Sequence, residues 1–206
     1  EGTLLDKWEI KTNTENNGES ILSDVAKSVD NKLAQEGISK DEVQGIGVGV
    51  PGPVDSKGVV HRCVNLGWAT VDVEEELSSL TGLKVKAGND ANVAALGEMW
   101  QGGAKGCTDV IMVTLGTGVG GGIIVDGKIV AGFNGAGGEI GHITVNNDEI
   151  EACNCGQYGC LEQYTSATGI VRLAKRKLAK STEETSIRAI ENLTAKDVFD
   201  AAKADD

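Results

Sequence analysis

One histidine and three cysteines in a glycine-rich segment are the first residues that indicate chemistry. His142 is followed by Cys153, Cys155 and Cys160. One imidazole and three thiolates complete the tetrahedral shell of Zn²⁺ and leave no coordination position open. A redox cluster is the alternative, but a C-x-C pair with a third cysteine and a histidine favours a metal. We therefore predict a structural zinc site, with the reaction carried out elsewhere.

A second candidate is the glycine-rich segment Gly116–Gly122, which contains a G-x-G-x-x-G match. A dinucleotide fingerprint needs a helix directly after these glycines, whereas here a strand and the hairpin signal Asp126-Gly127 follow. Backbone amides of such a loop can still bind phosphates, and Thr117 adds a hydroxyl. A tight hairpin is the alternative, but seven residues exceed what such a turn needs. The segment therefore predicts a phosphate-binding loop between two strands.

Asn89 and Asp90 stand where a predicted strand ends and a predicted helix begins. Either residue could simply cap the helix. Alternatively, Asp90 is a catalytic carboxylate that orients a hydroxyl and accepts its proton, because a helix N-terminus favours the ionised form. Phosphoryl transfer depends mostly on positioning and electrostatics, so it tolerates such a weak base. Both interpretations remain open at this point.

Three more polar residues, Asn65, Glu139 and Glu162, lie in loop-like surroundings. Each one alone is more often a solvated or capping residue. Glu139 and Glu162 bracket the metal ligands in the sequence, so a bound ion would draw both carboxylates together. Paired carboxylates accept hydrogen bonds from vicinal hydroxyls. Aromatic residues make up only 3% of the chain, so a sugar would have to be held by polar groups of this kind.

Hydrophobic periodicity and breaker residues predict the elements that position these groups. Asp72 with Glu75, and Thr194 with Asp197, have the spacing of helix N-terminal caps. The character of the sequence changes near Cys107, which predicts a small domain over 1–106 and a large one over 107–206. The predicted helices are 20–36, 72–81, 90–101 and 161–179, followed by two shorter ones, and the predicted strands are 4–11, 45–50, 83–87, 110–115, 123–125 and 128–130.

The overall composition excludes several classes of protein. The 206 residues carry a net charge of −12, from 31 acidic and 19 basic residues. A free nucleic-acid-binding module normally has the opposite sign. No run approaches the ~18 apolar residues of a membrane span, and no secretory signal opens the sequence. These features predict a cytoplasmic protein without nucleic acid or membrane partners.

Taken together, the motifs resemble the ROK family (repressors, open reading frames and kinases). The resemblance covers essentially the whole chain, and its most specific part is Gly141-His142 followed by CNCGQYGCLE at 153–162. NDANVAALGE at 89–98 and LGTGVGGGII at 115–124 reinforce it, and together with VNLGW at 64–68 they are similar to the glucokinases of this family. The resemblance implies an α/β, actin-like ATPase (ribonuclease H-like) fold, with two α/β domains flanking a cleft.

The resemblance also implies a reaction and a role for each site residue. The reaction is phosphorylation of glucose at the 6-hydroxyl by ATP with Mg²⁺, in a homo-oligomer that is a dimer or a tetramer. Asp90 would be the base, and His142 would use one ring nitrogen for zinc and the other for the sugar. Sugar contacts are implied for Gly52 (through its backbone), Asn65, Asn89, Asp90, Glu139, His142 and Glu162, and ATP contacts for Gly116, Thr117 and Gly118.

One departure from the family pattern concerns the two ends of the chain. The family's first phosphate-binding turn, an Asp-x-Gly-Gly-Thr hairpin, is absent, as are the elements expected to complete the adenosine pocket. We therefore expect a fragment of the enzyme. Two alternatives stay open: a sugar-responsive repressor of the same family, and a kinase for another hexose such as N-acetylmannosamine or fructose.

Overall fold

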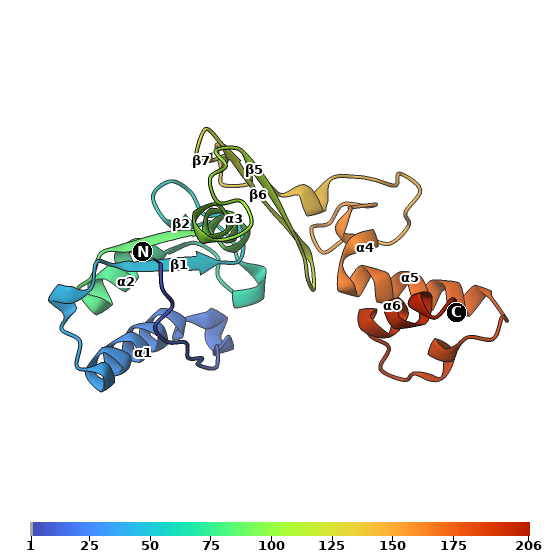
Figure 1. Ribbon diagram of the computed structural model, residues 1–206, viewed down its shortest axis with the longest axis horizontal. Helices are drawn as coiled ribbons and strands as arrows, with labels where there is room; N and C mark the ends of the chain where they lie inside the picture. The colour runs from blue at the N-terminus through green and yellow to red at the C-terminus, as the bar shows by residue number, and fades with distance from the viewer. Residues whose placement is uncertain (1) are drawn as a thin grey trace. The chain divides into compact units, whose positions relative to one another are not determined.

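The computed structural model describes residues 2–206, and the chain divides into two units. The first unit holds Glu1–Ile111 with Gly122–Gly137, and the second holds Met112–Gly121 with Gly138–Asp206. Figure 1 follows the order of the elements from blue to red. The predicted division between residues 106 and 107 stays a prediction.

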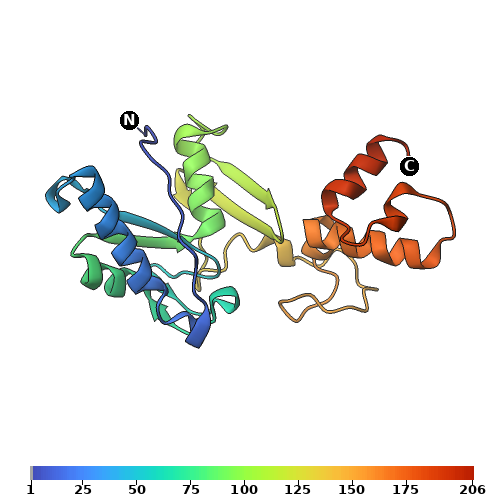
Figure 2. The same cartoon turned by 90° about the horizontal axis from the view of Figure 1, so that it is seen from below.

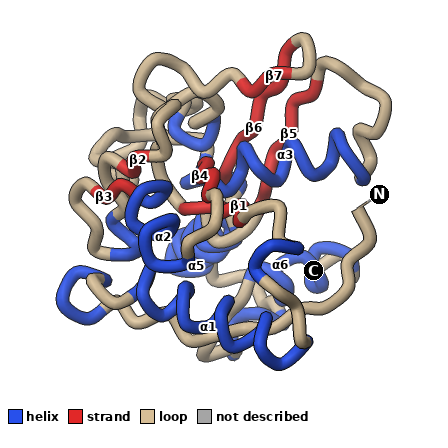
Figure 3. Tube along the Cα trace, turned by 90° about the vertical axis from the view of Figure 1, so that its left-hand side faces the viewer, coloured by secondary structure: helices blue, strands red, loops and turns tan. Residues whose placement is uncertain are grey.

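A parallel pair of strands organises the first unit. Strand β1 (Ile46–Val50) pairs with β4 (Val85–Asn89) in a register that places Val50 opposite Asn89. Helix α1 (Ile21–Glu36) lies on one side of this pair and α3 (Asp90–Gln101) on the other (Figures 1 and 3). Parallel strands are typically covered on both faces in this way. Because both strands end at the same edge, the turn after β1 and the start of α3 come together there.

Apolar side chains of α1 and of the segments after β1 form the core of this unit. Helix α2 (Val73–Thr81) packs against α1 and β4, and its Val73 and Leu77 are fully buried. The predicted cap is confirmed, because the side chain of Asp72 accepts the N–H of Glu75 at 3.0 Å. The shorter elements are the antiparallel pair β2 (Val59–Val60) and β3 (Val71–Asp72) and the 3₁₀ turns η1 (Glu15–Gly18), η2 (Lys40–Glu42) and η3 (Val64–Leu66).

The glycine-rich segment differs from its prediction. A three-stranded sheet has the order β5 (Val110–Leu115), β6 (Val119–Val125) and β7 (Lys128–Ile129), as Figure 3 shows. Strand β6 starts at Val119, so only residues 116–118 form the turn, and the predicted seven-residue loop is wrong. The other glycines belong to a closely packed strand. A Cβ on Gly121 would lie 2.5 Å from the carbonyl oxygen of Gly138, and one on Gly122 would lie 2.6 Å from Cβ of Ala95.

An extended residue separates the first two helices of the second unit, which the sequence pattern did not indicate. The single helix predicted over 161–179 is wrong, because Ser166 is extended and separates α4 (Glu162–Thr165) from α5 (Ala167–Lys180). The hydroxyl of Ser166 caps α5 by accepting the N–H of Gly169 at 3.0 Å. The elements that complete the unit are η4 (Ile140–His142), η5 (Ser186–Ala189) and α6 (Ala195–Lys203). Helix α6 packs on α5 (Figure 2).

The strand predicted over 4–11 is wrong, since the segment has no regular structure and Leu5 is 90% exposed, with no neighbouring strand to pair with it among the described residues. The predicted capping box of Thr194 and Asp197 is confirmed. Among residues 2–206, no helix is both long and apolar enough to cross a bilayer.

Candidate functional site

The start of α3 assigns different tasks to Asn89 and Asp90. Asn89 is the N-cap, because its Oδ1 accepts the N–H of Asn92 at 3.1 Å. Its Nδ2 donates to the carbonyl oxygen of Gly52 at 3.1 Å, which ties the end of β4 to the turn after β1. Asp90 is exposed, and its Oδ1 accepts the neighbouring N–H of Ala91 at 2.8 Å. The capping function therefore belongs to Asn89, and the carboxylate of Asp90 is directed to the surface.

Gly52 fits this position because it has no side chain. Its φ of 103° lies in a region that other residues rarely adopt, and an added Cβ would lie 2.8 Å from the carbonyl oxygen of Arg62. The structure thus brings three predicted site residues of the first unit together: Gly52, Asn89 and Asp90.

Asn65 lies on a separate tight loop of the first unit. The backbones of Cys63 and Trp68 exchange two hydrogen bonds of 3.0 Å and close the loop, which leaves Asn65 exposed at its turn. Trp68 is 6% exposed and its Nε1 donates to the carbonyl oxygen of Gly18 at 3.1 Å. The buried indole therefore anchors the loop that carries Asn65.

The structure brings the four predicted metal ligands together in the second unit. The ligand atoms of His142, Cys153, Cys155 and Cys160 all lie within 4.8 Å of one another. Two edges measure 3.6 Å, between Sγ of Cys155 and Cys160, and 3.7 Å, between Sγ of Cys153 and Nδ1 of His142. A tetrahedron with metal–sulfur bonds of about 2.3 Å has edges of about 3.8 Å. These four residues can therefore hold one tetrahedral ion.

The backbone around the cluster turns tightly at a glycine of the motif. Gly156 has a φ of 89° and donates its N–H to the carbonyl oxygen of Cys153 at 2.8 Å. Burial raises the pKa of the Cys153 thiol, and it raises the pKa of the Cys160 thiol to about 12. Without an ion both thiols thus keep their protons near neutral pH, and metal binding must release them.

Glu139 and Glu162 both lie beside the cluster, as the sequence predicts. A carboxylate oxygen of Glu139 is 4.0 Å from Nε2 of His142, while Nδ1 of the same ring faces the thiols. One oxygen of Glu162 is 3.8 Å from Sγ of Cys153. The other accepts the N–H of Val119 at 2.9 Å. The two nitrogens of His142 therefore face different groups.

The turn at 116–118 is fastened to the start of α5. The carbonyl oxygen of Gly116 accepts the N–H of Ala167 at 2.9 Å, and that of Thr117 accepts the hydroxyl of Thr168 at 2.8 Å. Thr117 itself is exposed. The turn is no longer than a tight hairpin needs, so its length does not indicate phosphate binding, but its backbone is fixed, which is what a phosphate-binding turn needs.

Sequence reasoning missed a buried ionic cluster in the same unit. Glu149, between His142 and Cys153, forms ion pairs with Arg172 and Arg176 at 3.0 and 2.9 Å. One signal was present in the sequence, because two arginines four residues apart lie on one face of a predicted helix. Nothing in the sequence indicated which acidic residue they would bind.

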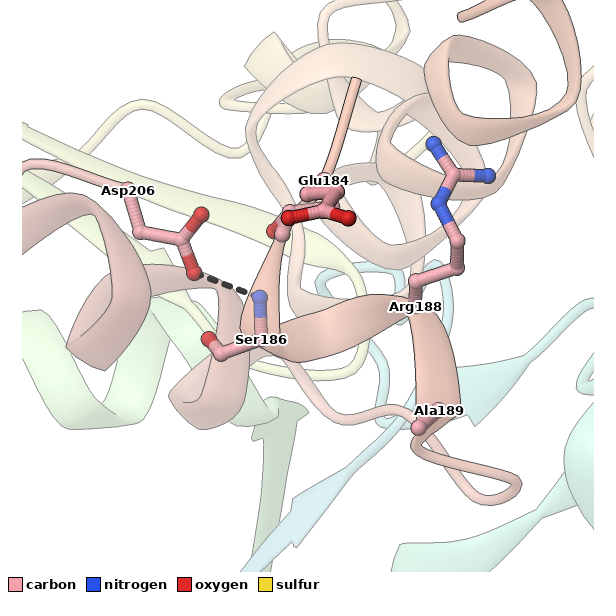
Figure 4. A pocket seen from close by; sticks show the side chains of 6 residues that line it. Glu184, Ser186, Arg188, Ala189 and Asp206 are labelled. Carbon is pink, nitrogen blue, oxygen red and sulfur yellow. Dashed lines mark hydrogen bonds between the residues drawn. The ribbon is translucent and has the colours of Figure 1, made fainter. Parts of the chain in front are cut away.

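A cavity of about 670 Å³ in the second unit is lined by other residues, among them Ser186, Arg188 and Asp206 (Figure 4). Its polar groups already bond to the chain, since Asp206 accepts the N–H of Ser186 at 2.7 Å and Arg188 donates to the carbonyl oxygens of Leu178, Ser181 and Glu183. The cavity contains none of the predicted site residues. Its size therefore does not identify the functional site.

These elements define an α/β protein with the actin-like ATPase fold, which is related to that of ribonuclease H, and this confirms the predicted fold class. The chain belongs to the ROK family, whose family model matches residues 1–206. The resemblance inferred from the motifs is thereby confirmed.

The chain is similar both to kinases and to a transcriptional regulator of this family. The glucokinase of Halalkalibacterium halodurans is 44% identical over 100% of this chain and 63% of its own length. A ROK family glucokinase from Streptomyces griseus, solved with glucose and AMPPNP, superposes with a TM-score of 0.75 at 33% identity, over 96% of this chain and 63% of that one. A ROK family transcriptional regulator, a homologue of the E. coli Mlc protein, superposes with a TM-score of 0.78 at 25% identity, over 90% and 47%. This chain thus spans about 63% of the length of each of these two glucokinases.

Proposed function

We propose that the complete protein is an ATP-dependent hexose kinase that phosphorylates glucose at its 6-hydroxyl. The names of two similar proteins, a glucokinase and a glucokinase solved with glucose and AMPPNP, support glucose and ATP as the substrates. The observation that carries the proposal is the division of tasks at the start of α3. Since Asn89 caps the helix, Asp90 is available as an exposed carboxylate at a helix N-terminus.

In this proposal Asp90 accepts the proton of the 6-hydroxyl as the oxygen attacks the γ-phosphorus of ATP. A bond forms between this oxygen and phosphorus, the bond from phosphorus to the β,γ-bridging oxygen breaks, and ADP leaves with that electron pair. Mg²⁺ bound with ATP would neutralise charge on the phosphates. Asp90 then needs only to orient the hydroxyl and hold a proton, which a weak base can do.

The proposed sugar contacts come from residues of both units. In the first unit they are the backbone of Gly52 and the side chains of Asn65, Asn89 and Asp90. In the second unit they are Glu139, His142 and Glu162, whose oxygen and nitrogen atoms lie around the metal cluster. Carboxylates and amides of this kind recognise hydroxyls, which agrees with the low content of aromatic residues.

Gly116, Thr117 and Gly118 are the proposed contacts to the ATP phosphates. The turn is short and fastened through its carbonyl oxygens, so it fits the binding of phosphate by the amides of Thr117 and Gly118 and by the Thr117 hydroxyl.

We also propose that His142, Cys153, Cys155 and Cys160 hold one structural Zn²⁺. Three thiolates and one imidazole at tetrahedral spacing suit zinc, and four protein ligands leave no position for substrate. The ion would fix the ring of His142 through Nδ1, so that Nε2 is presented to a sugar hydroxyl beside Glu139. Reduced thiols and an acidic chain fit a cytoplasmic protein, and a homo-oligomer remains the expectation.

A coupled assay of ADP release on the full-length protein tests this function. Glucose should give the highest kcat/KM in a panel that includes fructose, N-acetylmannosamine and N-acetylglucosamine. A higher value for another hexose would move the proposal to that substrate. No ADP release with any hexose, together with a helix-turn-helix upstream of Glu1, would support the repressor alternative instead.

A further inference from the structure

A buried carboxylate lies in the middle of the segment that joins two metal ligands. Residues 143–152 connect His142 to Cys153, and the Glu149 side chain in this segment is only 1% exposed. Glu149 is no metal ligand, because the cluster consists of one histidine and three cysteines. An enclosed carboxylate in a loop needs a physical reason, since burial of an unpaired charge is strongly unfavourable.

Hydrogen-bond donors surround both oxygens of Glu149. Its Oε1 accepts the backbone N–H groups of Ile150 and Glu151 at 3.0 and 3.2 Å. Its Oε2 accepts the hydroxyl of Tyr164 at 2.7 Å and the Arg172 guanidinium at 3.0 Å. Arg176 donates to both oxygens, at 2.9 and 3.0 Å. The hydrogen bonds from Arg172 and then Tyr164 hold the pKa of Glu149 well below its usual range, so it stays ionised at neutral pH.

The same network reaches the backbone of the metal ligands without touching their thiols. Arg172 donates to the carboxylate of Glu151 at 2.8 Å and to the carbonyl oxygen of Gln163 at 3.1 Å. The side chain of Gln163 then links a metal ligand to the connecting segment. It accepts the N–H of Cys160 at 3.1 Å and donates to the carbonyl oxygen of Glu151 at 2.9 Å. Asn146 adds a bond to the hydroxyl of Tyr164 at 2.9 Å. Helices α4 and α5 therefore hold the segment at several points.

We propose that Glu149, bound by Arg172 and Arg176, is a positioning residue that keeps the metal-ligand segment ordered whether or not the metal is bound. This inference rests on the proposed zinc site. Ordering a loop has a free-energy cost in conformational entropy, and in a flexible loop metal binding would have to offset that cost. Here the ionic cluster offsets it during folding, so that the ligands are preorganised and the ion is retained.

The first test measures zinc release from the full-length, zinc-loaded protein into excess colorimetric chelator. Glu149→Gln should release zinc about tenfold faster or more, in the range seen when groups supporting metal ligands are removed. Glu151→Gln is the matched control, because it shares Arg172 but its side chain is 48% exposed. Its release rate should stay within about fivefold of wild type, as for exposed ion pairs.

Tyr164→Phe provides a second variant in case Glu149→Gln does not fold. It removes one donor to Glu149 and leaves every charge in place, so we expect a smaller increase, of about two- to tenfold. Folded variants at both positions that release zinc at the wild-type rate would overturn the proposal. If Glu149→Gln is unfolded even with zinc, the Tyr164→Phe result decides.

Hydrogen exchange on metal-free wild-type protein tests the ordering directly. The amides of Ile150 and Glu151, which donate to Glu149, should stay protected after zinc is removed. Loss of this protection in an otherwise folded protein would show that the metal orders the segment, and would also overturn the proposal. A wild-type protein that never contains zinc would instead refute the zinc site itself, so the two failures are distinguishable.

Discussion

Glu162 connects the metal cluster to the sheet, because it accepts the backbone N–H of Val119 at 2.9 Å where β6 begins. Its other oxygen lies 3.8 Å from Sγ of Cys153. One carboxylate thus contacts both a proposed zinc ligand and the strand that follows the proposed phosphate-binding turn. A change at the metal should therefore affect sugar binding directly and phosphate binding only through this connection.

Replacement of Cys155 by serine tests that order of effects. The variant removes a metal ligand without removing a proposed sugar contact. We expect the KM for glucose to rise on the order of tenfold or more, because the ring of His142 loses its support, with a smaller rise for ATP. A thermal melt is the necessary control, since loss of a structural metal can unfold a domain. An unchanged glucose KM in a folded, zinc-free variant would contradict the prediction.

Elemental analysis tests the metal itself. Protein purified without added metal should contain about one equivalent of zinc per chain, bound by His142, Cys153, Cys155 and Cys160, because these four groups match a tetrahedral ion. Disulfides among these cysteines, or metal-free protein with normal sugar affinity, would speak against the site.

Asp90→Asn should lower kcat by about 10²- to 10⁴-fold, the usual contribution of a general base, while glucose still binds. Calorimetric titration with glucose separates the two effects. Glu98→Gln, on the same helix, is the control and should keep near-normal kcat. A turnover close to wild type in Asp90→Asn would leave Asp90 without a catalytic role.

Alanine at two glycines of the glycine-rich segment should affect stability differently, because one glycine lies in the closely packed strand β6 and the other in the open turn before it. Gly122→Ala places a methyl group 2.6 Å from Cβ of Ala95 and 2.7 Å from the carbonyl oxygen of Ala91, and overpacking of this kind costs about 1–3 kcal/mol. Gly116→Ala meets nothing within 4 Å, so its melting temperature should stay near that of wild type. Equal melting temperatures for the two variants would show that β6 can shift to accept a side chain.

The stability contributed by Glu149 should depend on pH in a defined direction. Its pKa is lowered in the folded protein, so its contribution is complete above the unfolded pKa of about 4.3 and is lost as the pH falls towards the folded value. The charged and titratable groups that face it, Arg172, Arg176 and Tyr164, are present in both proteins compared, as is the exposed Glu151.

Urea unfolding of metal-free wild type and Glu149→Gln measures this contribution. The difference in their free energies of unfolding should be largest between pH 5 and 7. It should shrink as the pH falls below about 4.3, the pKa of glutamate in the unfolded chain. A difference that stays constant down to about pH 3 would show that the carboxylate is no better stabilised in the folded state than in the unfolded chain.

The sequence predicted those features that depend on local chemistry. The metal ligands, the caps at Asp72 and Thr194, and the helix that begins at Asp90 all follow from residue types at short spacings. The distinction between Asn89 and Asp90 at that helix start was left open, because both residues can cap and only the hydrogen bonds differ.

Features that depend on distant partners were missed or mistaken. Gly121 and Gly122 were assigned to a phosphate-binding loop, although they lie in strand β6 where Gly138 and Ala95 approach it. Ser166 interrupts a periodic apolar pattern because its side chain caps α5. Glu149 meets Arg172 and Arg176 across 23 and 27 positions of sequence, and no local pattern specifies that pairing.

The burial of Trp68 gives the protein an intrinsic optical reporter. The chain has three tryptophans, and Trp8 and Trp100 are 49% and 60% exposed, whereas Trp68 is 6% exposed and bonded to Gly18. A soluble quencher such as acrylamide therefore suppresses the emission of Trp8 and Trp100 first and leaves that of Trp68. Because this indole anchors the loop that carries Asn65, the remaining fluorescence follows that loop and can be titrated with sugar without any label.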